Sequence, residues 1–245
     1  HALGAHGDSG WALASTTDMI FGVSNEGGTC TSWPPPDCPS PAPSPGGGDC
    51  YAFGLNATSG EALWKAKTGA PGGGGTVVED AARNLSLFIA GSWAQTLVAY
   101  DIETGKQVWS FRTGGEVESH PAYHDGVVYT SAEETKTVFA INATTGGELW
   151  RYDGAAREIN SSPSLSLDTV FIGSNDHYIH AVSRATGAFK WKVRTCANVF
   201  ASAAIADDGM VYIACNTETG PTWGRGIGAV YAIDPARQHN ITVLK

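Results

Sequence analysis

Short runs of apolar residues, separated by glycine-containing turns, follow one another along the chain. A typical run is Thr137–Ile141, which leads into a Thr-Gly turn and then into a second run around Trp150. Runs of this length, rich in Val, Ile, Tyr and Phe, predict β-strands, and the Thr-Gly turns predict tight hairpins. No apolar run approaches the roughly 20 residues that a membrane-spanning helix requires.

The turn and the strand that follows it form a repeat. The segment Asn142–Trp150 has counterparts at Asn56–Trp64, Asp101–Trp109 and Ser183–Trp191, at intervals of 41 to 45 residues, and a degenerate fifth copy begins at Asp234. In these turns the glycine can take a positive φ, the Asn or Asp can hydrogen-bond the turn, and the tryptophan is large enough to pack between neighbouring sheets. Self-similarity at this period indicates a repeat architecture.

Four short antiparallel strands per repeat are typical of a β-propeller blade, because stacked sheets bury both of their faces. We therefore predict an all-β fold, a β-propeller of about five visible four-stranded blades, either complete or part of a larger seven- or eight-bladed ring. A single domain spans residues 1–245, with a Pro- and Cys-rich loop inserted at 24–49. The predicted blades are roughly 9–69, 74–114, 117–154, 159–196 and 199–245.

Charge and modification motifs narrow the functional classes. The net charge of −9 excludes a nucleic-acid partner, because the chain offers no basic patch that could displace counterions. Five cysteines and five Asn-x-Ser/Thr sequons favour a secreted or extracellular location, although asparagine also simply suits tight turns. The candidate N-glycosylation sites are Asn56, Asn84, Asn142, Asn160 and Asn240.

The cysteines divide into two groups. Cys30, Cys38 and Cys50 lie in or at the base of the inserted loop, so we expect one local disulfide among them. Cys196 and Cys215 are expected on the same face of the propeller, and we pair them. Because five is an odd number, one thiol remains or bridges to another chain.

Two long insertions fall in equivalent connections of the first and fifth blades and are therefore expected on one face. The first contains the run Ser40–Pro45, whose prolines favour an extended polyproline II conformation, in either a solvated loop or a recognition element. Exposed aromatic and Arg side chains favour interfaces, so Trp33, Trp223 and Arg225 are our interface candidates.

Polar residues at the starts of the innermost strands are expected to line the mouth of the central channel. They could bind a ligand and offer a general base, or they could be small and polar only because the strand starts crowd around the axis. His177 and His180 flank a short turn, and we assign them no metal role. The channel candidates are Glu118, His120, Asn160, Ser162 and Ser202.

The motif at Ala99–Trp109 reads Ala-x-Asp-x-x-Thr-Gly-x-x-x-Trp, with looser copies starting at Ala140 and Ala232. It resembles the repeat of pyrroloquinoline-quinone (PQQ)-type propellers. That superfamily contains quinone-dependent alcohol dehydrogenases, a non-catalytic outer-membrane assembly lipoprotein and sensor domains, so the resemblance implies the fold and leaves the function open. The adjacent cysteine pair of many quinone dehydrogenases is absent from the sequence, and no catalytic Asp of that family can be placed by motif.

These features favour a non-catalytic β-propeller, secreted or in the secretory-pathway lumen, that acts as a protein- or glycan-interaction module or as a structural module, with no catalytic residue, metal or cofactor assigned. One alternative is a PQQ-dependent oxidoreductase, or a fragment of one, in which Glu118 and Asn160 have suitable side chains for holding Ca²⁺. A second alternative is a lectin-like protein that binds sugars.

Overall fold

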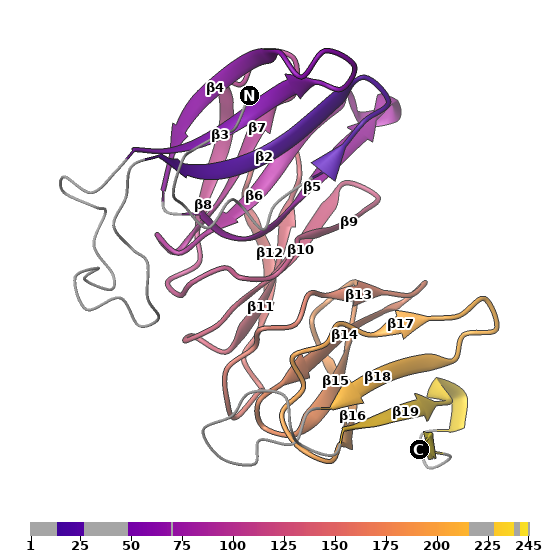
Figure 1. Ribbon diagram of the computed structural model, residues 1–245. Helices are drawn as coiled ribbons and strands as arrows, with labels where there is room; N and C mark the ends of the chain where they lie inside the picture. The colour runs from indigo at the N-terminus through magenta and orange to yellow at the C-terminus, as the bar shows by residue number, and fades with distance from the viewer. Residues whose placement is uncertain (1–13, 27–48, 70, 216–227, 238–240, 245) are drawn as a thin grey trace. The chain divides into compact units, whose positions relative to one another are not determined.

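Five four-stranded antiparallel sheets make up the fold of this computed structural model, which describes residues 14–26, 49–69, 71–215, 228–237 and 241–244 (Figure 1). In every sheet the four strands pair in chain order, so each strand lies beside its neighbour in the sequence. No helix among the described residues is long and apolar enough to cross a membrane. The predicted all-β fold, with four strands per repeat, is confirmed.

Each sheet takes its four strands from one continuous stretch of the chain. The first sheet contains β1 (Ala14–Ser15), β2 (Met19–Glu26), β3 (Asp49–Asn56) and β4 (Ala62–Thr68). The second contains β5 (Pro71–Asp80), β6 (Leu85–Ser92), β7 (Thr96–Asp101) and β8 (Gln107–Arg112). The third contains β9 (Ala122–His124), β10 (Val127–Ala132), β11 (Thr137–Asn142) and β12 (Glu148–Tyr152). The fourth contains β13 (Ser164–Leu165), β14 (Thr169–Ser174), β15 (Tyr178–Ser183) and β16 (Phe189–Arg194). The fifth contains β17 (Ala204–Ile205), β18 (Val211–Cys215), β19 (Ala229–Ile233) and β20 (Ile241–Leu244). Two short 3₁₀ turns are η1 (Ala81–Arg83) and η2 (Pro235–Arg237).

The chain divides into two compact units. The first comprises residues 1–127 and 142–147, and the second comprises residues 128–141 and 148–245. Each has an apolar core between sheets, built in the first unit around Phe21, Phe88 and Tyr100 and in the second around Phe171, Ile213 and Ile233. The assignment of residues 1–245 to a single domain stays a prediction.

The repeat tryptophans dock on the turn of the following repeat. In three copies the indole Nε1–H donates a hydrogen bond to a backbone carbonyl at the same position of the next turn, directly after its Asp, Asn or Ser. Trp191, in the fourth copy, packs in the apolar cluster of the second unit with Tyr231 and Ile233. The three hydrogen-bonded pairs are Trp64 with Ile102 (2.7 Å), Trp109 with Ala143 (2.7 Å) and Trp150 with Arg184 (3.0 Å).

The turn glycines make room for these indoles. Gly105, Gly146 and Gly187 have φ values of 68°, 71° and 70°, a region that L-residues with a side chain rarely adopt. A Cβ at Gly105 or Gly187 would lie 2.6 Å from the nearest indole atom, and one at Gly146 would lie 2.8 Å away. The Thr-Gly motif is therefore required both by the turn and by the tryptophan of the preceding repeat.

The two requirements can be separated by substitution. Gly60 has the same left-handed conformation (φ 71°) as Gly105, but a Cβ there would meet nothing within 4 Å. Gly60→Ala should cost only the left-handed backbone, about 1–2 kcal/mol. Gly105→Ala should cost a further 1–3 kcal/mol, roughly, because the methyl group overpacks against Trp64. Urea unfolding of both variants measures the two losses in the free energy of unfolding. Equal losses would mean that the indole does not need the space beside the turn glycine.

Candidate functional site

The channel candidates of the second unit hydrogen-bond to neighbouring protein groups. The backbone N–H of Ser162 donates to Ser202 Oγ at 3.0 Å, and Asn175 Nδ2 donates to Asn160 Oδ1 at 3.1 Å. Between Asn160 and Ser162, the buried Ser161 hydroxyl donates to the Gly173 carbonyl at 2.9 Å. The structure thus brings Ser162 and Ser202 together, and these bonds join adjacent segments of the unit.

In the first unit, Glu118 and His120 lie against a run of buried glycines on β5. The N–H of Gly73 donates to the Val117 carbonyl at 2.8 Å. A Cβ at Gly73 would overlap the backbone of Glu118, and one at Gly74 would overlap the His120 ring. The glycine run therefore does not form an open cradle for a cofactor, because the Glu118–His120 segment already occupies the space beside it.

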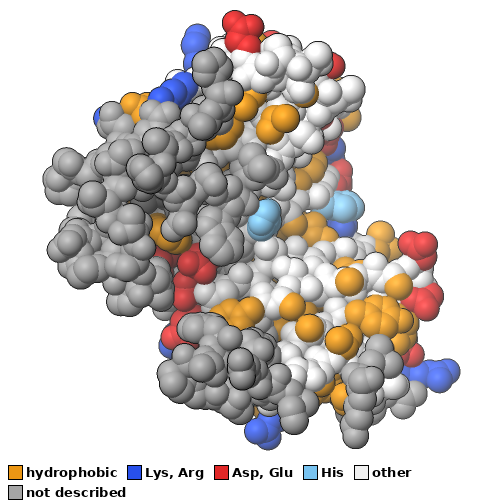
Figure 2. Space-filling view, viewed as in Figure 1, with side chains coloured by type: hydrophobic (Ala, Val, Ile, Leu, Met, Phe, Trp, Pro, Cys, Tyr) orange, Lys and Arg blue, Asp and Glu red, His pale blue; other side chains and the backbone are white. Residues whose placement is uncertain are grey.

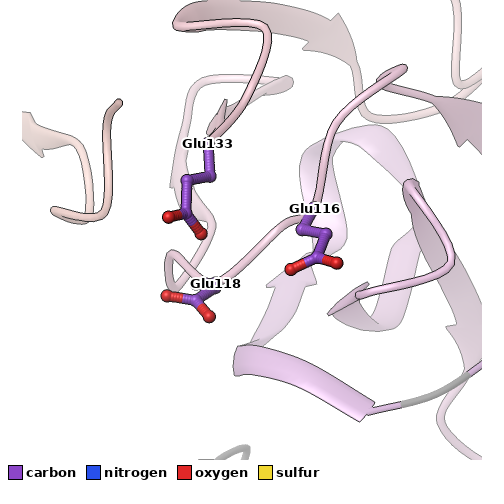
Figure 3. Close-up of side chains that lie close together, drawn as sticks. All are labelled: Glu116, Glu118 and Glu133. Carbon is purple, nitrogen blue, oxygen red and sulfur yellow. The ribbon is translucent and has the colours of Figure 1, made fainter. Parts of the chain in front are cut away.

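Carboxylates gather on the segment between β8 and β9. Figure 3 shows Glu116 and Glu118, whose oxygens lie within 4.8 Å of each other, and it also labels Glu133, which follows β10 and belongs to the second unit. Carboxylate oxygens suit Ca²⁺, but acidic groups at such distances are common without an ion, so they assign no metal site by themselves. Glu118 and Asn160, the pair with suitable side chains for Ca²⁺, belong to different units.

A buried Asp–His–Tyr chain is the most elaborate polar arrangement that we find in the second unit. His180 Nδ1 lies 2.9 Å from the Tyr152 hydroxyl, and His180 Nε2 lies 3.0 Å from Asp176 Oδ2. Asp176 also accepts the backbone N–H groups of Ala156 and Tyr178, at 3.0 and 3.1 Å. The His180 and Asp176 side chains are only 1% and 4% exposed. This Asp–His–Tyr arrangement ties the turn before β15 to β12 of the preceding sheet.

The protonation states of this chain follow from its surroundings. Burial, reinforced by the charges of Asp176 and Asp153, raises the pKa of Tyr152 to about 12. Burial by itself would raise the pKa of Asp176, but hydrogen bonds from His180 and from the Ala156 N–H outweigh it and lower that pKa to about 2. A protonated phenol can therefore donate to Nδ1 while Nε2–H donates to an ionised carboxylate. All three side chains are buried.

Sequence reasoning missed this arrangement, although one signal was present. His180 stands one residue before the partner of the repeat tryptophan, where the other copies have Phe53, Val98 and Phe139. A histidine at an apolar position of a repeat predicts a buried polar partner. Asp176 and Tyr152 could not be identified as those partners, because the sequence does not say which side chains reach across the sheets.

The structure describes some of the remaining candidates. Cys196 and Cys215 form a disulfide with a Cα–Cα distance of 6.0 Å, the pairing that we expected. It joins the segment after β16 to the end of β18, where the second insertion begins. Cys50 is buried on β3. The candidates that lie outside the described residues are Cys30, Cys38, Trp33, Trp223, Arg225 and Asn240.

Comparison with known proteins gives relatives of more than one kind. The family described as outer membrane protein assembly factor BamB matches residues 51–207. The chain is 33% identical over 96 residues to 1-butanol dehydrogenase (quinone) of Thauera butanivorans, covering 34% of this chain and 15% of the dehydrogenase. It is 22% identical over 161 residues to BamB of Shewanella oneidensis, covering 63% of this chain and 40% of that protein. The matched part thus spans well under half of either relative.

A solved structure supports the fold. The crystal structure of BamB from Moraxella catarrhalis superimposes with a TM-score of 0.67 at 18% sequence identity, covering 97% of this chain and 61% of that one. At this identity the likeness establishes the fold alone. The five four-stranded sheets are therefore β-propeller blades, and the predicted resemblance to PQQ-type propellers is confirmed.

The Asp–His–Tyr chain makes stability depend on pH. Because folding depresses the pKa of Asp176 from 3.8 to about 2, its stabilisation is present above pH 4, roughly, and is lost as the pH falls through about 2. Asp176→Asn should therefore lower the free energy of unfolding at pH 7 by about 2 kcal/mol, and the deficit should shrink below about pH 4. Urea unfolding between pH 2 and 7 measures it. Asp168→Asn, which removes an exposed ion pair to Lys190, is the control and should cost less than about 1 kcal/mol. A deficit independent of pH would refute the assignment.

Proposed function

The chain belongs to the PQQ-like repeat family described as outer membrane protein assembly factor BamB, and from this membership we propose that it is a non-catalytic β-propeller that binds a protein partner outside the cytosol. The observation that supports the non-catalytic role is the burial of the Asp176–His180–Tyr152 arrangement. His180 is 1% exposed and lies within hydrogen-bonding distance of Asp176 and Tyr152, so its imidazole holds sheets together and does not face a substrate.

The polar groups at the predicted channel mouth support the same conclusion. Ser162, Ser202 and Asn160 take part in hydrogen bonds within the second unit, and in the first unit the glycine run at Gly73 is filled by the Glu118–His120 segment. Acid–base catalysis needs side chains poised around a reacting atom. Ser162, Ser202 and Asn160 are instead bonded to neighbouring segments, as expected of a scaffold.

Surface composition favours a protein as the partner. On the face drawn in Figure 2, hydrophobic side chains of the second unit are interspersed with uncharged ones, while charged side chains lie mainly at the borders. The last strand of every sheet carries a large apolar side chain that is about half exposed. Exposed apolar groups of this kind suit protein contacts. These residues are Leu63, Val108, Leu149, Phe189 and Val243.

The two insertions are the proposed binding segments. The Cys196–Cys215 disulfide fixes the base of the second insertion, because β18 ends at Cys215 and β19 resumes at Ala229. An anchored loop loses less conformational freedom on binding. Trp33, Trp223 and Arg225, which lie outside the described residues, are the proposed contact residues. Chemical cross-linking of the protein within the cellular fraction that contains it identifies the partner.

The quinone alternative is supported by the 33% identity to 1-butanol dehydrogenase (quinone) over 96 residues. A PQQ enzyme would be stabilised by its cofactor, so a saturable rise in Tm on adding PQQ with Ca²⁺ would support that alternative. Binding to a glycan array would support a lectin. Our proposal expects neither response.

Substitution in the binding segments tests the proposal directly. The double variant Trp223→Ala/Arg225→Ala should weaken binding of the cross-linked partner at least tenfold, roughly, because buried aromatic and Arg side chains dominate interface energies. Biolayer interferometry measures the Kd. Leu167→Ala, which truncates an exposed residue in the turn between β13 and β14, is the control and should leave the Kd unchanged. An unchanged Kd in the double variant, or a loss of binding only in the control, would refute the assigned contact residues.

A further inference from the structure

Three sequons of the first unit lie in turns between consecutive strands. Asn56 ends β3 and Asn142 ends β11, so both begin the turn between the third and fourth strands of a sheet. Asn84 follows η1, in the turn between the first and second strands of the second sheet. The third residues of the sequons, Thr58 and Thr144, are exposed, and Ser86 is partly exposed.

Hydrogen bonds and an ion pair connect the Asn84 and Asn142 turns. The N–H of Ile102 donates to the Ser86 carbonyl at 3.1 Å, and the N–H of Ala143 donates to the Gly126 carbonyl at 2.9 Å, so each bond joins two segments of one sheet. Arg83, next to Asn84, forms ion pairs with Asp80 and with Asp125, which precedes Gly126. The Asn84 turn is therefore connected to the Asn142 turn.

In Asn56 and Asn142, the hydrogen bonds of the turn use the side-chain oxygen Oδ1 and do not use the amide nitrogen Nδ2. Asn56 Oδ1 accepts the N–H groups of Thr58 and Ser59 at 2.9 and 2.8 Å. Asn142 Oδ1 accepts those of Thr144 and Thr145 at 2.9 and 3.0 Å. All four bonds end on the oxygen, so a substituent on Nδ2 leaves the turn intact.

Asn84 is accessible for a different reason. It caps η1 in the left-handed conformation, with φ 53° and ψ 45°, and its backbone N–H donates to the Ala81 carbonyl at 3.3 Å. The residue as a whole is exposed, while Leu85 after it is buried. The turn is thus held by the backbone and by Leu85, and the Asn84 side chain is not needed for it.

Asn160 differs from these three in the partners of its sequon. Its Oδ1 accepts a hydrogen bond from Asn175 Nδ2, and the N–H of Ser162, the third residue of the sequon, donates to Ser202 Oγ. Both ends of this sequon are therefore bonded to side chains of other segments of the second unit, whereas Asn56 and Asn142 bond only within their own turns.

We propose that Asn56, Asn84 and Asn142 carry N-linked oligosaccharides and that Asn160 does not. The donor is a lipid-linked oligosaccharyl diphosphate. A bond forms between the asparagine Nδ2 and the first sugar carbon, the bond from that carbon to the diphosphate oxygen breaks, and the amide gives up one proton as the lipid diphosphate leaves. The motif Asn-x-Ser/Thr is the acceptor that this transfer uses.

The Asn56 glycan would lie at one end of the first sheet. In the first sheet, β3 begins at Asp49, where the long insertion ends, and finishes at Asn56. The insertion and the Asn56 glycan therefore attach at opposite ends of the same strand. If the proposed function holds, the Asn56 glycan lies at the end away from the first insertion, but its presence does not depend on that function.

Peptide mass spectrometry of the protein purified from the cells that make it tests the assignment. Enzymatic release of N-glycans in ¹⁸O-labelled water converts each occupied asparagine to labelled Asp. We expect the label at Asn56, Asn84 and Asn142 and unlabelled Asn at Asn160. Label at Asn160, or its absence from any of the other three, would overturn the proposal.

Sequon variants separate glycan loss from misfolding. Thr58→Ala and Thr144→Ala keep the backbone N–H groups that Asn56 and Asn142 accept, so each should fold and lose one glycan, seen as one step in gel mobility. Ser162→Ala destroys the Asn160 sequon and should leave the mobility unchanged. A mobility shift in Ser162→Ala, or none in Thr58→Ala, would contradict the proposed set.

Discussion

The fit of an indole into the notch above a turn glycine is the interaction on which this fold depends. Trp64 meets Gly105 and Ile102 of the next repeat, and Trp109 meets Gly146 and Ala143. The ring needs the space that a Cβ would fill, and its Nε1–H needs a carbonyl at one position of the turn. One short motif thereby fixes both the hairpin within a sheet and the contact between consecutive sheets.

This coupling explains how much of the fold can be predicted from the sequence. The tryptophan interval and the Thr-Gly turns encode local geometry, so strand order and the number of sheets followed directly. The strand boundaries could be predicted less well from the sequence. β5 starts at Pro71, and its glycine run packs against Glu118, a contact that no local sequence pattern predicts. The division into two units was not foreseen either, since every repeat carries the same kind of signal.

The site was less predictable because it depends on contacts between distant residues. Asn160 and Ser162 were identified as channel residues, but only the structure pairs them with Asn175 and Ser202. His180 was treated as a loop histidine, yet it lies between Asp176 and Tyr152 in the core. In both cases polar groups that could have suggested chemistry instead satisfy the hydrogen-bonding needs of packed sheets. A scaffold that binds a partner through its loops fits that pattern.

Hydrogen exchange in a tryptophan variant tests the central interaction most directly. In Trp109→Phe the ring shrinks and the hydrogen bond to the Ala143 carbonyl is lost. Mass spectrometry should then show faster exchange both in β8 and in the turn Asn142–Gly147 of the next repeat, with no change in the distant turn Asn56–Gly60. Faster exchange confined to β8 would contradict the account, because the indole would then stabilise only its own strand.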